Sequence, residues 1–224
     1  MTSTWVRQVI AARQYTVDWR FISLRLVNAD VDYAAHFPPD YEAEHSAGLR
    51  MLRVAARARA ELGPEAVGAL QQSFGEHIFE IPPWESKEAR RAALGSPEYT
   101  ARILTHAGLP AGLVDALDDE SWDDELASET AEALALTGKD VGTPIIHVDP
   151  PDGVAFFGPV ISRRPSDEEA VELWDHVLAL ARWPGFSELK RSLRERLQLN
   201  VFGIGAGEVG RQEDWHQGSR RLKR

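Results

Sequence analysis

Apolar residues recur with two different periods along the first 24 positions. A stripe at helical spacing marks the first segment: Trp5, Val6, Val9 and Ile10. This spacing predicts a helix from Met1 to about Arg13. Between Tyr15 and Leu24 the apolar residues alternate with polar ones, at Val17, Trp19 and Phe21. Alternation of β-branched and aromatic residues favours a strand there.

Residues 40–138 show helical spacing throughout, interrupted only by residues that end or begin helices. Gly63 and Pro64 stand between two amphipathic stretches, where the glycine ends one helix and the proline opens the next. Pro110 opens a short helix, and Gly138 ends the last and longer one. The pattern therefore predicts an all-helical block of several helices.

Two short apolar segments centred on Ile145 and Phe156 follow the helical block. The first is entered through Thr143-Pro144, and a short polar turn separates it from the second. Runs of this length bounded by proline and glycine are typical of strands. We expect both strands to share one sheet with the strand predicted at Val17.

The remaining elements are predicted to be helical. Ser166-x-x-Glu169 is a capping box, and it opens a helix that should end before Pro184. Leucine spacing over 186–197 predicts a last helix. The apolar segment 197–204 is expected to form a surface tail or an extension of that helix.

Composition narrows the functional classes. The 224 residues carry a net charge of −10, which argues against a nucleic-acid-binding surface. A basic cluster at 220–224 is interpreted as a solvated tail. Neither a membrane span nor a signal peptide is visible, so a cytoplasmic location is expected. The chain contains no cysteine, which excludes disulfides, thiolate metal sites and intrinsic thiol redox chemistry.

Several collinear segments resemble the DsbA-like oxidoreductases of actinobacteria, in particular the mycothiol-dependent nitroreductases. The segments that carry the resemblance span about four-fifths of the chain: Phe21-Ile22-Ser23-Leu24, Leu26-Val27-Asn28, Ala107-Gly108-Leu109-Pro110-Ala111, Asp140-Val141-Gly142-Thr143-Pro144-Ile145-Ile146-His147-Val148, Gly153-Val154-Ala155-Phe156-Phe157-Gly158-Pro159-Val160 and Phe186-Ser187-Glu188-Leu189-Lys190-Arg191. A set of this kind is far more specific than a single Gly-Thr-Pro.

The resemblance implies an α/β, thioredoxin-like fold with a large all-helical insertion. It assigns 1–39 and 139–197 to the thioredoxin-like domain, 40–138 to the insertion and 198–224 to a C-terminal tail. The family carries a Cys-Pro-x-x motif after a first β-strand, and both are missing here. Either the start was assigned late, at an internal Met, or the chain is a decayed or repurposed homologue. The sequence thus resembles a truncated member of the family without a catalytic residue.

The same resemblance suggests binding residues. Thr143 and Pro144 match the family's cis-proline, whose neighbouring backbone can pair with a bound thiol or peptide. Trp84 follows Pro82-Pro83 in a predicted loop and is the candidate for contact with a flat substrate. The alternatives are a plain strand-entry proline and an aromatic residue of the core.

Other polar residues have structural explanations as well as functional ones. The hydroxyls of Thr2, Ser3 and Thr4 stand at a helix start, where they either cap the helix or hold a thiolate. His147 lies on a predicted buried strand, which favours a hydrogen-bonded structural role. No metal site is predicted, because His36, His45, His77 and His106 lack ligand spacing and their acidic neighbours suit solvated helix faces.

Two functions remain open from the sequence. In the first, the protein is a thiol-disulfide oxidoreductase or mycothiol-dependent nitroreductase that lacks redox activity as written, because it has no cysteine. In the second, it is a non-redox, thiol-binding isomerase or binding module. Both use mycothiol, or another low-molecular-weight thiol, as cosubstrate or ligand with no bound cofactor. The physiological substrate and the oligomeric state stay open.

Overall fold

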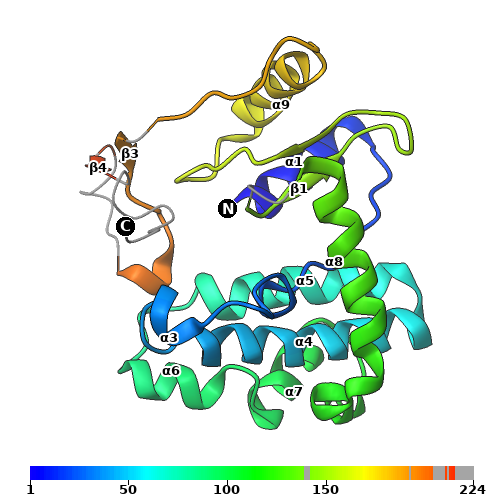
Figure 1. Ribbon diagram of the computed structural model, residues 1–224, viewed down its shortest axis with the longest axis vertical. Coiled ribbons are helices and arrows are strands. Elements are labelled where there is room, and N and C mark those ends of the chain that lie inside the picture. The colour runs from blue at the N-terminus through cyan, green and yellow to red at the C-terminus, as the bar shows by residue number, and fades with distance from the viewer. Residues whose placement is uncertain (139–141, 192, 204–209, 211, 215–224) are drawn as a thin grey trace. The chain divides into compact units, whose positions relative to one another are not determined.

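The computed structural model describes residues 1–138, 142–191, 193–203, 210 and 212–214. These residues form two compact units. Unit one comprises Met1–Val17 and the described residues between Ala133 and Asp214, and unit two comprises Asp18–Glu132. Figure 1 shows the helices and strands of each unit. No helix among the described residues is both long and apolar enough to span a bilayer.

Unit one is built on two helices that pack against each other, α1 (Thr2–Arg13) and α9 (Asp167–Ala181). Their shared core contains Trp5, which is 0% exposed, together with Val9 and Trp174. The Trp5 indole Nε1 donates to the Ala170 carbonyl at 2.9 Å, so the buried donor is satisfied. The helix predicted over residues 1–13 is therefore confirmed, and its apolar stripe is the face that α9 covers.

The start of α9 follows the predicted capping box. The Ser166 hydroxyl accepts from the Glu169 amide at 3.2 Å, while the Glu169 carboxylate accepts from the Ser166 amide at 2.9 Å. Asp167 and Glu168 complete an acidic first turn, which complements the positive end of the helix dipole. The helix ends at Ala181, before Pro184, as the sequence predicts.

The two strands predicted around Ile145 and Phe156 form an antiparallel hairpin. β1 (Ile145–His147) pairs with β2 (Ala155–Phe157), with Ile146 opposite Phe156. The turn between them depends on Gly153, because a Cβ atom there would lie 1.8 Å from the Val148 carbonyl oxygen. Only glycine therefore fits this position of the turn.

The segment after α9 contradicts the predicted last helix. Residues 186–191 belong to no helix or strand, and β3 (Leu193–Glu195) pairs with β4 (Gln212–Asp214) in a second antiparallel hairpin. The short helix η3 (Asn200–Phe202) follows, and Leu199 beside it is buried. Leucine spacing alone misled, because the expected apolar face is not buried as a whole: Leu189 is 78% and Leu193 54% exposed.

The predictions for the C-terminal end are tested only in part. The expected extension of a last helix over 197–204 is not observed in its described residues, which hold a buried Leu199 and η3. The assignment of 198–224 to a C-terminal tail stays a prediction. Ile204, the basic residues 220–224 and positions 140–141 of the family-like segment lie outside the described residues.

Unit two is helical. Its elements are α2 (Leu24–Val27), α3 (Tyr33–His36), α4 (Tyr41–Leu62), α5 (Pro64–Phe79), α6 (Lys87–Ala93), α7 (Pro97–His106), η1 (Ala111–Asp118), η2 (Glu120–Trp122) and the first part of α8 (Asp123–Thr137). Figure 1 shows α4 and α5 running along this unit, with α6 and α7 beside them. As predicted, residues 40–138 contain helices and no strand, with α4 ending at Gly63 and α5 beginning at Pro64.

The core of unit two lies between α4, α5, α7 and η1. Its fully buried members include Val54, Leu70, Ile103 and Leu126. Charged groups on α4 also reach inward: Arg53 donates two hydrogen bonds of 2.7 Å to the Asp123 carboxylate. This bidentate pair fixes the start of α8 against α4.

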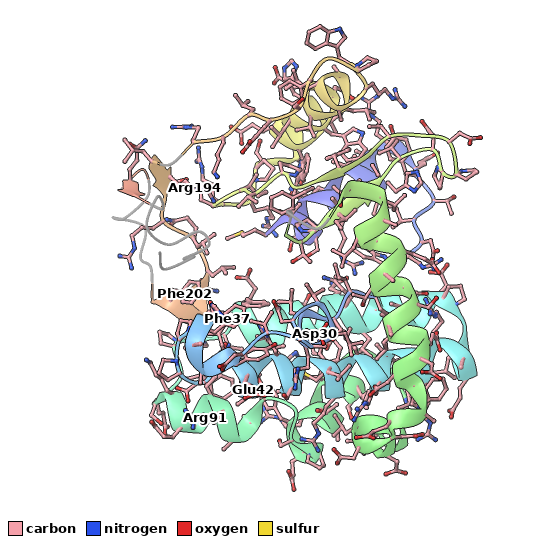
Figure 2. All side chains as sticks on the ribbon, viewed as in Figure 1. Asp30, Phe37, Glu42, Arg91, Arg194 and Phe202 are labelled. Atoms are coloured by element: carbon pink, nitrogen blue, oxygen red, sulfur yellow. The ribbon has the colours of Figure 1, made fainter. Side chains whose placement is uncertain are left out.

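An aromatic cluster covers the start of α4. The rings of Phe37 and Tyr41 stack at 5.6 Å, and the Tyr33 hydroxyl lies 2.9 Å from His45 Nδ1. His45 is thus half-buried. Figure 2 shows the side chain of Phe37 near the end of α3.

The predicted strand at Val17–Phe21 is not observed. Residues 15–23 form no ladder with any described strand. Instead the Phe21 amide donates to Glu129 Oε2 at 2.7 Å, and the Ser23 amide donates to Thr130 Oγ1 at 3.0 Å. Of the alternating apolar residues, Phe21 is buried but Val17 is 37% exposed, and Ser23, which the alternation did not include, is buried. Side chains of α8, which no local pattern identifies, satisfy the backbone of this segment in place of a partner strand.

Candidate functional site

The start of α1 presents helix amides without a capping side chain. Met1 is the N-cap residue and makes no side-chain cap hydrogen bond, and the first turn carries no acidic residue. The amide end of a helix carries a partial positive charge and binds anions, including thiolates. The hydroxyls of Ser3 and Thr4 lie in this turn, are partly exposed and bond to no described residue. This turn therefore offers hydrogen-bond donors to an anionic group.

Thr2 connects this helix start to the end of β2. Its hydroxyl, in a side chain only 9% exposed, donates to the Pro159 carbonyl at 2.8 Å. Because the hydroxyl proton is committed there, Thr2 has only acceptor capacity left for a ligand. Of the three hydroxyls that the sequence singles out, Thr2 thus has a positioning role. Ser3 and Thr4 donate to no residue in the described part of the chain.

The end of β2 is connected in turn to the start of β1. The Gly158 amide donates to the Pro144 carbonyl at 2.9 Å. The Thr143–Pro144 and Gly158–Pro159 peptide bonds are both cis. Gly158 is buried with φ +94°, a conformation that favours glycine. Two hydrogen bonds therefore join the first turn of α1, the Gly158-Pro159 segment and Thr143-Pro144 into one cluster within unit one.

An aromatic ring lies next to this cluster. Phe157 is 40% exposed, and a Cβ atom at Gly142 would come within 3.3 Å of its ring. Because Gly142 has no side chain, the Phe157 ring can lie close to the backbone there. Thr143 is exposed and Pro144 half-buried. The cluster combines helix amides, hydroxyls and one flat apolar surface, which is the mixture that small-molecule sites commonly use.

Trp84, the third predicted binding residue, belongs to unit two. It lies in the loop between α5 and α6, half-buried, with its ring 5.5 Å from that of Tyr99. Its indole Nε1 is buried and has no hydrogen-bond partner among the described residues. The loop position was predicted correctly. A joint site of Trp84 with Thr143 and Pro144 stays a prediction.

His147 differs from the sequence-based expectation. It ends β1, opposite Ala155, and is half-buried, where a buried and hydrogen-bonded side chain was expected. Its side chain bonds to no described residue. A two-stranded hairpin leaves one face of β1 less covered than a central strand would be, which explains the difference.

The sequence did not identify Pro159 and Phe157 as members of the site. Gly158-Pro159 is a recognisable turn signal, so a break after β2 could have been expected. The contact of Pro159 with Thr2 joins residues 157 positions apart, however, and no local pattern encodes it.

Comparison with known proteins identifies the family. Residues 1–191 match the model of the family described as "Rv2466c-like: Mycothiol-dependent nitroreductase Rv2466c". The chain is also 28% identical over 191 residues to "Uncharacterized protein Rv2286c" of Mycobacterium tuberculosis (strain ATCC 25618 / H37Rv), an alignment that covers 85% of this chain and 75% of the relative. The match includes every residue of the α1–Pro144–Pro159 cluster. The chain belongs to the Rv2466c-like family of mycothiol-dependent nitroreductases.

Proposed function

We propose that this protein binds mycothiol at the first turn of α1 and serves thiol-dependent redox chemistry in which the bound thiol supplies the sulfur. The observation that carries the proposal is the cluster of α1, Pro144 and Pro159 in a chain that matches a mycothiol-dependent family over 1–191. Because the 224 residues contain no cysteine, they provide no sulfur nucleophile of their own. A cytoplasmic location and a thioredoxin-like domain for unit one are parts of this proposal.

The chemistry assigned to each group follows from its position. The amides of the first turn stabilise the thiolate of the bound thiol and so lower its pKa. Ser3 and Thr4 supply hydroxyl donors beside it. Thr2 holds the helix start to Pro159, and the backbone at Thr143 is the partner proposed for the polar part of the ligand.

The electrons of the proposed reaction come from the thiol. Two thiol molecules reduce a nitro group to a nitroso group, and they yield one disulfide and one water. Both thiols come from solution, so the protein contributes binding, orientation and thiolate stabilisation. The chain alone is expected to show no dithiol–disulfide turnover, because a Met thioether cannot replace a thiolate.

The experiment measures mycothiol binding by calorimetry and, separately, mycothiol consumption in the presence of a nitroaromatic compound. Saturable binding, with two thiols consumed per nitroso product formed above the uncatalysed rate, supports the proposal. Absence of saturable binding contradicts it. Insulin reduction by the protein without added thiol would contradict the assignment of all sulfur chemistry to the ligand.

A non-redox isomerase or binding module is the second candidate, and the absence of cysteine favours it. It predicts mycothiol binding without any thiol consumption. The consumption assay therefore separates the two functions.

A further inference from the structure

Two histidines from different helices meet on unit two. His77 lies in the last turn of α5, and His106 ends α7. Their ring centroids are 4.6 Å apart, and the ring planes are inclined by 73°. The Tyr99 hydroxyl donates to the His77 carbonyl at 2.5 Å and so holds the end of α5 to α7. Sequence spacing could not reveal this pair, because 29 positions separate its members.

Hydrogen bonds to Ser73 fix the neutral tautomer of both rings. His77 Nδ1 lies 2.9 Å from the Ser73 carbonyl oxygen, which can only accept, so this nitrogen carries the proton. The Ser73 hydroxyl donates its one proton to the Ile103 carbonyl at 2.9 Å. It must therefore accept from His106 Nδ1, which lies 3.2 Å away. In both neutral rings, Nε2 is the nitrogen that keeps its lone pair.

The Nε2 atoms are available to a ligand. Neither His77 nor His106 uses Nε2 in a hydrogen bond with the described residues, and His77 is only half-buried. The His106 side chain is 53% exposed. Because both Nδ1 atoms face Ser73, both Nε2 atoms lie on the sides of the rings turned away from it.

The arrangement around the two rings is that of metal-binding histidines. Such residues usually donate the second ring N–H to a backbone carbonyl or a carboxylate, which sets the tautomer and raises the basicity of the ligand. His77 does so to the Ser73 carbonyl. Glu76 Oε2 lies 3.6 Å from His106 Nδ1, and Gln72 holds the other carboxylate oxygen at 2.9 Å. Ser73 thus holds Nδ1 of both imidazoles by a hydrogen bond, and a carboxylate lies near that of His106.

The spacing of the rings fits one metal ion. Two imidazoles that bind an ion at about 2.0–2.1 Å, with an N–metal–N angle of about 90–110°, have centroids about 4.5–5.2 Å apart. The observed 4.6 Å corresponds to the smaller angles, which octahedral and tetragonal ions prefer. No third His, Cys, Asp or Glu joins the two within the described part of the chain, so water would occupy the remaining positions.

We propose that His77 and His106 form a two-histidine site for a divalent transition-metal ion of the Ni²⁺ or Cu²⁺ type, bound through both Nε2 atoms. The site is independent of the thiol-binding cluster, which lies in unit one. It does not suit Mg²⁺ or Ca²⁺, because neutral imidazole is a poor ligand for hard cations.

The test titrates tag-free, full-length protein with Ni²⁺ by calorimetry. We expect one strong site per chain, a melting temperature that rises with Ni²⁺ concentration, and no competition by excess Mg²⁺. H77A and H106A should each weaken binding by more than tenfold. S73A keeps both imidazoles but removes one supporting oxygen, and it should weaken binding by about tenfold.

The matched control is the double variant H36A/H176A, which removes two exposed histidines outside the pair. It should bind Ni²⁺ as the wild type does. The proposal is overturned if the control loses as much affinity as H77A and H106A, or if those two variants bind like wild type. The melting temperatures of all metal-free variants show whether each protein is folded. If an alanine variant is not folded, H77Q or H106Q replaces it, because glutamine keeps the side-chain volume. Unchanged Ni²⁺ affinity in the glutamine variants would also overturn the proposal.

Discussion

Glu129 is a carboxylate whose removal should strongly disturb unit two. It lies on α8, its side chain is 7% exposed, and it accepts from the Phe21 amide at 2.7 Å and from Arg59 Nη2 at 2.7 Å. The Arg59 guanidinium also lies 4.3 Å from the centre of the Phe21 ring. One carboxylate thus holds the segment at Phe21 and the half-buried Arg59 guanidinium of α4 together.

The magnitude for E129A follows from these contacts. Leaving the Phe21 amide buried and unpaired costs about 1–3 kcal/mol. Removing one partner of a fully buried ion pair costs about 3–5 kcal/mol. Only part of that applies here, because the Arg59 side chain is 19% exposed and keeps Glu125 as a second partner. Because the two losses overlap, we expect E129A to lower the free energy of unfolding by about 2–4 kcal/mol. E129Q keeps an acceptor oxygen and should cost about 1–2 kcal/mol.

The assay combines urea unfolding, followed by circular dichroism, with hydrogen exchange at the Phe21 amide. E129A should lower the midpoint and accelerate that exchange, because the amide loses its acceptor. The control is E132A, since Glu132 is 61% exposed and pairs with the exposed Arg20. If E129A stays within about 0.5 kcal/mol of wild type, as surface substitutions do, and the Phe21 exchange rate is unchanged, the reasoning is wrong.

Three further predictions concern single groups. D123A should destabilise the protein by about 3 kcal/mol in urea unfolding, because it leaves the buried Arg53 guanidinium without its bidentate partner; wild-type stability would contradict this. T2V should weaken mycothiol binding in calorimetry, because the start of α1 loses its hydrogen bond to Pro159, whereas T2S should bind normally; equal affinities would show that this bond does not position the helix. Burial lowers the pKa of His45, so its NMR titration midpoint should lie below about 6.5. The contribution of neutral His45 to the free energy of unfolding should be complete above about pH 6.5 and lost as the pH falls through the lowered pKa. A midpoint at or above about 6.5 would contradict the expected direction of the pKa shift.

Helices with clear start and stop signals could be predicted from the sequence. Gly63 and Pro64 separate α4 from α5, and the Ser166–Glu169 capping box opens α9. In each case the residues that satisfy the helix ends are neighbours in the chain, so local physical chemistry determines the boundary.

Elements that depend on distant partners were predicted less well. The alternation at Val17–Phe21 predicted a strand, which needs a partner strand to accept from its amides. In the structure, side chains of α8 accept from the amides of Phe21 and Ser23 instead, and no local pattern encodes that contact. The stripe at 186–197 had helical spacing, but its members Leu189 and Leu193 stay exposed. Both errors arise because secondary structure is selected by tertiary packing as well as by periodicity.

Some residues of the candidate site could be predicted from the sequence, and the contacts between distant segments could not. Thr143 and Pro144 were predicted from the resemblance, and Thr2 was singled out as a hydroxyl at a helix start. Thr2 lies next to the segment that bonds Pro144. The Pro159 carbonyl that completes the cluster has no signal in the sequence that links it to Thr2. Pairs formed between helices, such as His77 and His106, are equally invisible to spacing.

The location of bound mycothiol tests the central claim most directly. Amide chemical shifts of the labelled protein are followed by NMR as mycothiol is added, with S-methylated mycothiol as the control ligand. The account predicts saturable shifts at the amides of Ser3, Thr4, Thr143 and Gly158, and weaker binding of the methylated ligand, which cannot form a thiolate. Shifts confined to other parts of the chain, or equal affinity for both ligands, would contradict it.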